Sequence, residues 1–184
     1  GELYLTNAVI TENDAGKSGG GYAACPTSQT VVRLKNGAAV YGNKAKTGRE
    51  VHINASVIWY GNSAKPKYEL AESMLGGAPY HWKIDDTSDE NGRELPHGRL
   101  HGELATGELN LANDVSEEGI AAAKELAAVE IIGNHAGQRG GGIGSNGDVY
   151  IGTGGQIAVR VKKTWKDNNN ARGNRPKSVR VGLY

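Results

Sequence analysis

A short pattern recurs along this chain of 184 residues. An apolar or aromatic pair is followed, usually after a glycine, by Asn-x-Ala, and the copies are Val9–Ala15, Ala39–Ala45, Ile58–Ala64 and Ile131–Ala136. Two copies continue into a triple glycine and a large residue, as Gly19-Gly20-Gly21-Tyr22 and Gly140-Gly141-Gly142-Ile143. A pattern repeated in this way predicts one structural unit that stacks on further copies of itself.

The pattern favours a coil of short parallel strands, in which alternate side chains point inward. An Asn after a strand tolerates left-handed backbone angles and can bond its own turn, so stacked turns are expected to align Asn13, Asn43, Asn62 and Asn134 in a ladder. Glycine allows tight corners and close approach of neighbouring turns, the role expected of Gly20, Gly21, Gly141 and Gly142. For residues 1–155 we predict an all-β fold, a right-handed parallel β-helix; the alternative is unrelated Asn-Gly turns in an ordinary β-sandwich.

The composition agrees with a narrow coil. The chain has 28 glycines and no phenylalanine, and aromatic residues make up 6% of it. Hydrophobic residues reach 38%, below the roughly 45–50% typical of globular domains. A core built on large side chains is therefore not expected, whereas a narrow coil needs small residues inside.

The spacing of the repeat is uneven, because the interval between Asn62 and Asn134 is far longer than the earlier ones. Residues 65–115 are predicted to be an insertion or degenerate turns of the coil, mostly loop and turn, with a strand at His81–Ile84. One short α-helix is predicted near 116–128, where alanine dominates, two acids occupy the first turn, and Asp114 or Ser116 can cap the helix.

Motifs for nucleotide and calcium binding fail on spacing. Gly16-Lys17-Ser18 lacks the glycine that a phosphate loop needs five residues earlier, where Thr11 stands. In the acidic run at 85–92, a calcium loop would place Thr87 and Gly98 at positions that need carboxylates. We therefore expect no nucleotide site and no calcium loop here.

The remaining candidates for chemistry are isolated. His97 and His101 have the spacing of zinc ligands on a helix, but Pro96 and nearby glycines oppose a helix. The single Cys25 is interpreted as a small buried side chain, and no Ser-His-Asp arrangement can be read. We expect no catalytic residue, no metal site and no cofactor.

The near-neutral net charge conceals an asymmetry. Residues 157–184 carry eight Lys or Arg and one Asp, a charge of +7, and the remaining 13 bases and 19 acids give 1–156 a charge of −6. Such a break predicts a domain boundary near 156. Nucleic-acid binding is not expected, because the basic segment lacks stacking aromatics and a recognition helix.

Residues 156–184 carry an ordered motif. Val159–Asp167 matches Val-x-Val-x-Lys-x-Trp-x-Asp, and Arg175–Leu183 reads Arg-Pro-x-Ser-Val-x-Val-x-Leu. This resembles the opening of a Cna protein B-type domain and implies the first two strands of a truncated β-sandwich. The resemblance also implies that Lys163 occupies the position whose amine forms an isopeptide bond with an Asn or Asp on the last strand, with that partner outside the fragment. The alternative is an ordinary surface lysine on a strand.

Residues 1–155 resemble glycine-rich coiled repeats of bacterial surface proteins, similar to polymorphic outer-membrane-protein and adhesin repeats. The two resemblances together imply a non-enzymatic, cell-wall-anchored Gram-positive adhesin or scaffold. The expected partner is a host or matrix glycan or protein. The chain contains no signal peptide and begins and ends in mid-pattern, so we interpret it as a fragment and expect peptidoglycan attachment only through a missing C-terminal segment.

Two other functions remain open on the sequence. A polysaccharide-active β-helix enzyme, lyase or hydrolase, would need clustered Asp or Glu on neighbouring turns of the coil. A purely mechanical spacer would need no ligand at all. The oligomeric state is not predicted.

Overall fold

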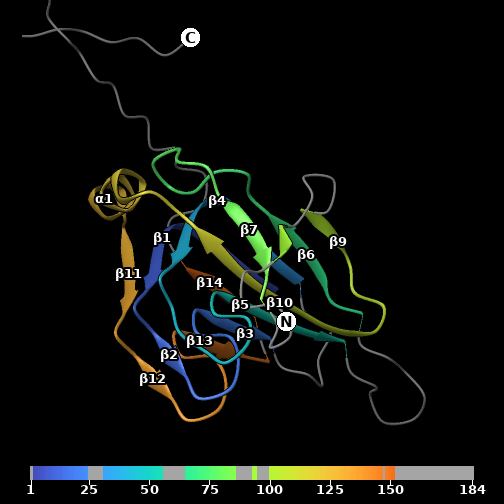
Figure 1. The fold of residues 1–184 in the computed structure, drawn as a ribbon. Coiled ribbons are helices and arrows are strands. Elements are labelled where there is room, and N and C mark those ends of the chain that lie inside the picture. Colours follow the sequence, from blue (N-terminus) through green and yellow to red (C-terminus); the bar gives the residue numbers. More distant parts are fainter. Residues whose placement is uncertain are drawn as a thin grey trace, which may run out of the picture.

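The computed structural model describes residues 2–24, 31–55, 65–85, 93–94, 100–146 and 148–151. This part of the chain is mostly β, with one short helix beside the strands (Figure 1). The predicted domain boundary near 156 and the expected sandwich strands of 156–184 lie outside the described residues.

Two large sheets and one small one contain the described strands. The first sheet has the order β11-β1-β4-β6-β9, with β14 also paired to β1, where the strands are Val129–Ile132 (β11), Glu2–Thr11 (β1), Val31–Tyr41 (β4), Lys67–Leu70 (β6), His101–Glu103 (β9) and Val149–Ile151 (β14). The second has the order β13-β3-β5-β10-β7-β8, comprising Ile143–Ser145, Tyr22–Ala24, Val51–Ala55, Gly107–Asp114, His81–Ile84 and Arg93–Glu94. The small sheet pairs β12 (His135–Ala136) with β2 (Asp14–Ala15).

Three copies of the repeat stack in parallel register, and we call them the 2–24, 31–55 and 129–151 layers. In the first sheet Ile10 pairs with Val40 on one side and with Ile131 on the other. In the second sheet Tyr22 pairs with Val51 and with Ile143. The 2–24 layer therefore lies between the other two, and the last copy in the sequence stacks on the first (Figure 1).

The two large sheets are mixed, because residues 65–115 extend them beyond the 31–55 layer with both parallel and antiparallel strands. β6 runs parallel to β4, whereas β9 runs antiparallel to β6, β10 to β5, and β7 to β10. The expected right-handed parallel β-helix over 1–155 is thus not confirmed by these sheets. The prediction of a strand at His81–Ile84 is confirmed by β7, but the expectation of loop and turn was wrong for the other strands of 65–115. Pairing with an open strand edge, rather than local propensity, decides that these residues are extended.

The core lies between the two large sheets and uses medium-sized aliphatic residues. Its fully buried side chains include Leu5, Ile10, Leu34, Ile53 and Leu111. A small aromatic group completes it at the 65–85 side, where the rings of Tyr80 and Trp82 lie 4.6 Å apart. Because the stacked layers share one interior, their aliphatic side chains can form a buried core without any phenylalanine.

Equivalent backbone positions adopt the left-handed region in each layer. The residue before the repeat's Asn is Glu12, Gly42 or Gly133, with φ of 59°, 65° and 70°. Glycine adopts this conformation freely, whereas a non-glycine residue is destabilised in it because its Cβ lies too close to the backbone. The turn therefore explains the glycine that usually precedes Asn in the repeat, and Glu12 keeps the same turn without one.

The predicted helix is confirmed as α1, which spans Glu117–Leu126. The side chain of Ser116 caps it by accepting a hydrogen bond from the Gly119 N–H at 3.1 Å. The helix packs on the turn after β6, where Cβ atoms at Gly76 and Gly119 would meet Ala122 and Ala78. No helix within the described ranges has the length and apolar character needed to span a membrane.

The close approach of layers at Gly21 generates the first testable prediction. A Cβ at Gly21 would lie 2.5 Å from the Glu50 backbone oxygen and 2.8 Å from Val40 Cγ1, whereas a Cβ at Gly137 would have no neighbour within 4 Å. We expect Gly21→Ala to lower the free energy of unfolding by about 2–4 kcal/mol through overpacking. Urea denaturation followed by circular dichroism measures this.

The matched control is Gly137→Ala, which we expect to change the free energy of unfolding by less than about 1 kcal/mol. Equal effects of the two substitutions would contradict the close layer contact at Gly21.

Candidate functional site

An asparagine ladder crosses the three layers. Asn134 donates from its backbone N–H at 3.0 Å and from Nδ2 at 2.9 Å to Asn13 Oδ1. Asn13 donates in the same way to Asn43 Oδ1, at 3.0 and 2.9 Å. Both steps use the same atoms, so the ladder has a direction: donors face the 31–55 layer and side-chain oxygens face the 129–151 layer.

The ladder also ties each asparagine to the backbone of the adjacent layer. Nδ2 of Asn13 donates to the Ile131 carbonyl at 2.9 Å, and Nδ2 of Asn43 donates to the Ile10 carbonyl at 3.0 Å. Asn13 and Asn43 are buried, at 0% and 4% exposure. Buried amides with satisfied donors and acceptors stabilise one register, because any slip leaves them unpaired.

Glu50 ends the ladder in the 31–55 layer. Its carboxyl oxygens accept from the Asn43 N–H at 3.4 Å and from Asn43 Nδ2 at 2.6 Å, the role that an asparagine oxygen plays in the other two steps. The strand register sets Val51 beside Tyr22, so Glu50 occupies the repeat position of Gly21 and Gly142. A glutamate thus replaces a glycine in the layer where, among the described residues, the ladder has no further asparagine.

Glu50 was missed in the sequence, although a signal for it was present. Gly48-Arg49-Glu50-Val51 is the third copy of the glycine run. Gly48 keeps the left-handed φ that Gly19 and Gly140 also have. Only one glycine of the triplet survives here, and Gly48 follows Asn43 by five residues, whereas Gly19 and Gly140 follow their asparagines by six. The signal was therefore weak in both composition and spacing.

Burial raises the pKa of the Glu50 carboxyl to about 8, against the opposing effect of the hydrogen bonds from Asn43 and the charge of Arg49. At neutral pH the side chain therefore holds its proton. A buried neutral carboxyl avoids the cost of a buried charge while its oxygens still accept hydrogen bonds.

The neighbours of Glu50 attach residues 65–115 to the 31–55 layer. Arg49 donates from its backbone N–H at 2.6 Å, and from Nε at 3.2 Å, to the Asp85 carboxylate. His52 is fully buried, with Nδ1 2.7 Å from Asn110 Oδ1, and burial lowers its pKa. These contacts hold β10 and the end of β7 against the layer.

The structure brings most of the predicted residues together. Asn13, Asn43 and Asn134 form the ladder. The Gly142 N–H donates to the Gly20 carbonyl at 2.8 Å and the Gly141 N–H to the Gly19 carbonyl at 3.1 Å, which places the two glycine runs side by side. A Cβ at Gly20 would meet the Arg49 and Lys44 carbonyl oxygens at 2.5 Å. The glycines at these corners allow backbone contact between layers.

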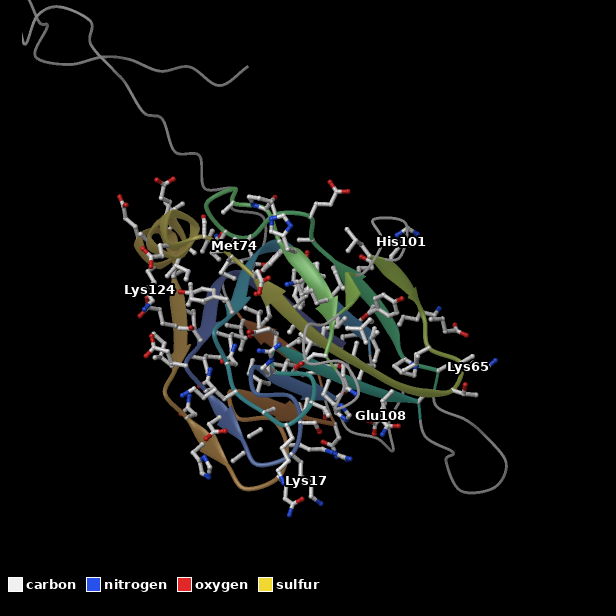
Figure 2. All side chains as sticks on the ribbon, viewed as in Figure 1. Lys17, Lys65, Met74, His101, Glu108 and Lys124 are labelled. Atoms are coloured by element: carbon white, nitrogen blue, oxygen red, sulfur yellow. The ribbon has the colours of Figure 1, made fainter. Side chains whose placement is uncertain are left out.

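Other predicted positions take no part in the ladder or fall outside the described residues. Asn62, Lys163, Cys25 and His97 belong to the second group. His101 lies on β9, with its side chain exposed (Figure 2). Within the described ranges, no group of three or more His, Cys, Asp or Glu side chains is arranged to hold a metal ion.

The ladder generates a second prediction, on stability. Asn13→Ala removes the hydrogen bonds that Asn13 makes to both neighbouring layers and leaves their polar atoms buried. We expect the free energy of unfolding to fall by about 2–4 kcal/mol, measured by urea denaturation. Asn54→Ala is the control, because Asn54 bonds Glu108 at an exposed site, and its cost should stay below about 0.5 kcal/mol. Similar losses in both variants would argue against the ladder.

Glu50 generates a third prediction, on pH. The folded state keeps the Glu50 proton up to about pH 8, while an unfolded chain releases it near 4.5. The folded state binds more protons in this window, so the contribution of Glu50 makes the free energy of unfolding fall as pH rises through it. Glu50→Gln should flatten this slope, whereas Glu72→Gln, at an exposed position, should leave it unchanged. Denaturation at several pH values tests this, and an unaltered slope in Glu50→Gln would refute it.

Comparison with known families gives one match. The model of the Cna protein B-type domain matches residues 159–184, so a B-type domain is present near the C-terminus. Neither the comparison with curated proteins nor that with solved structures gives a match. B-type domains are typical of Gram-positive surface proteins, and this one suggests the context of a surface-protein stalk or adhesin.

Proposed function

We propose that this chain is a non-enzymatic bacterial cell-surface adhesin or scaffold fragment, in which a short right-handed parallel β-helix is displayed on a B-type stalk. The B-type match at 159–184 carries the proposal. It follows the layered region in the sequence, an order expected of a displayed β unit that precedes a stalk domain.

Three features of the layers support a coil as the displayed unit. Equivalent residues pair in parallel register across three layers. The asparagine ladder repeats one hydrogen-bonding geometry, and the glycine runs bring the backbones into contact. In a stacked array each layer is stabilised by its neighbours, so such a unit can be rigid without a large aromatic core.

The alternative function is a polysaccharide-active enzyme, lyase or hydrolase, and a hydrolase would need an acid with a raised pKa open to a sugar. The described carboxyl with a strongly raised pKa is Glu50, and only 3% of it is exposed. Its oxygens are engaged with Asn43 inside the protein. This position favours a structural role for Glu50 and hence display over hydrolysis.

We propose a host or matrix glycan or protein as the partner, and the outside of a Gram-positive cell wall as the location. Peptidoglycan attachment would come from a segment beyond this chain. Lys163 is proposed as the isopeptide-forming lysine in the whole B-type domain. With an Asn partner, its amine would replace the amide nitrogen and release one ammonia.

A binding screen tests the proposed function. The 184-residue chain, immobilised on a surface, should bind at least one glycan or extracellular matrix protein of a panel in a saturable manner. Incubation with soluble polysaccharides should release no reducing ends or unsaturated products. Surface plasmon resonance and a reducing-sugar assay measure the two outcomes.

The control uses the matched pair of glycine variants. Gly137→Ala should keep the binding signal, while Gly21→Ala should lose it at a denaturant concentration that unfolds only this variant. Polysaccharide cleavage by the folded chain would replace the adhesin with the enzyme. The absence of any binding, with no cleavage, would replace it with the mechanical spacer.

A further inference from the structure

Equivalent positions of the repeat are buried in two layers and exposed in the third. Thr11 and Tyr41 are 1% and 3% exposed, whereas Ile132 is 37% exposed, and the pairing of Thr11 with both shows that the three positions are equivalent. Ile132 is also the large hydrophobic residue that stands exposed among the described ones. The 129–151 layer thus carries an apolar side chain at a position that the repeat buries elsewhere.

The 129–151 layer has one covered side in the described part of the chain. β11 and β14 pair only with β1, β12 only with β2, and β13 only with β3. Unpaired strand edges offer backbone N–H and C=O groups to another chain, and proteins commonly block them with charge, proline or a covering segment. Two turn glycines of this layer also face open space, because Cβ atoms at Gly133 and Gly137 would have no neighbour within 4 Å.

The asparagine ladder is also incomplete at this end. No described residue donates to Asn134 Oδ1, although the same oxygen of Asn13 and Asn43 accepts two hydrogen bonds. Asn134 Nδ2 donates its second hydrogen bond to the Ile132 carbonyl of its own layer at 3.4 Å, whereas Asn13 Nδ2 and Asn43 Nδ2 donate to carbonyls of an adjacent layer at 2.9 and 3.0 Å. Within the described part of the chain, Asn134 Oδ1 is therefore an acceptor without the two donors that the ladder supplies to Asn13 Oδ1 and Asn43 Oδ1.

The opposite end of the stack is closed by specific side chains. Glu50 accepts the hydrogen bonds of Asn43 there, and β10 pairs with β5 in antiparallel fashion. The Glu50 N–H donates to the Leu111 carbonyl at 2.9 Å. The ladder is thus terminated by a dedicated group at one end and left open at the other.

We propose that the open side of the 129–151 layer binds an extended segment of the same repeat, carried by another polypeptide and stacked in parallel. Such a segment supplies an apolar pair to cover Ile132, a carbonyl for Asn134 Nδ2, and an asparagine whose N–H and Nδ2 donate to Asn134 Oδ1. This interaction surface goes beyond the proposed adhesin function and does not depend on it.

The direction of the ladder excludes the simplest alternative occupant. Two 129–151 layers that meet about a twofold axis bring Asn134 Oδ1 toward its own copy, acceptor against acceptor. Where the axis is normal to the sheet, they also pair the strands antiparallel, in contrast to the parallel contact that the layers make with each other. A parallel repeat segment continues the existing interface without either change.

The test uses the full 184-residue chain and a synthetic peptide of residues 36–45, which contains the repeat around Asn43. Nuclear magnetic resonance titration should show saturable shifts of the Asn134 side-chain amide and the Ile132 methyl groups. A peptide with Asn43→Asp, which lacks the Nδ2 donor, should bind at least about tenfold more weakly.

Two protein variants locate the interaction. Ile132→Lys places a charge on the edge and should abolish the shifts, while Glu108→Lys, an exposed substitution on β10 (Figure 2), should leave them unchanged. Urea midpoints confirm that both variants fold, and the Asn43→Asp comparison needs no protein variant.

The proposal is overturned if the peptide causes no shifts, if both peptides bind equally, or if the shifts lie away from 129–145. Self-association of the chain through this edge without peptide, detected by sedimentation and prevented by Ile132→Lys, would also overturn it in favour of a second copy as the occupant.

Discussion

The asparagine ladder is the interaction on which the arrangement of layers depends. Asn13 uses its backbone N–H, its amide nitrogen and its amide oxygen to join both adjacent layers, and Asn43 and Asn134 each extend the ladder on one side. Asn13 and Asn43 do so inside the protein. A shift of one residue would bury these groups without partners, at a cost comparable to much of a domain's net stability. The ladder therefore selects one register, and hydrophobic burial then stabilises it.

The glycine runs and Glu50 are two solutions to the same geometric problem. Where another layer follows, glycine at the equivalent positions Gly21 and Gly142 allows backbones to approach. Where the ladder ends, Glu50 occupies this position and its side chain supplies the acceptor that another asparagine would have provided. Because burial keeps its proton on at neutral pH, the substitution ends the stack without burying a charge. The stack is therefore asymmetric, with one closed end and one open end.

The asymmetry connects the fold to the proposed functions. Residues 65–115 add antiparallel strands at the closed end and convert both large sheets into mixed ones. The open end presents Ile132 and Asn134 without such a cover in the described part of the chain. The proposed display on a B-type stalk depends on a stable β unit, to which the closed end contributes. The proposed addition of a layer by another polypeptide uses the open end.

The sequence by itself determined the local features of this protein. The repeated Asn-x-Ala and glycine runs indicated short strands, turns with positive φ and aligned asparagines, and the alanine-rich segment indicated α1, because these depend on residues close in the chain. The B-type motif around Lys163 could likewise be recognised locally. The tertiary structure alone decided that the 129–151 layer stacks on the 2–24 layer, that 65–115 adds the parallel strand β6 and several antiparallel strands, and that Glu50 ends the ladder. Strand order and pairing depend on contacts between strand edges and buried hydrogen-bond donors that lie far apart in the sequence. No local pattern of a single sequence encodes those contacts.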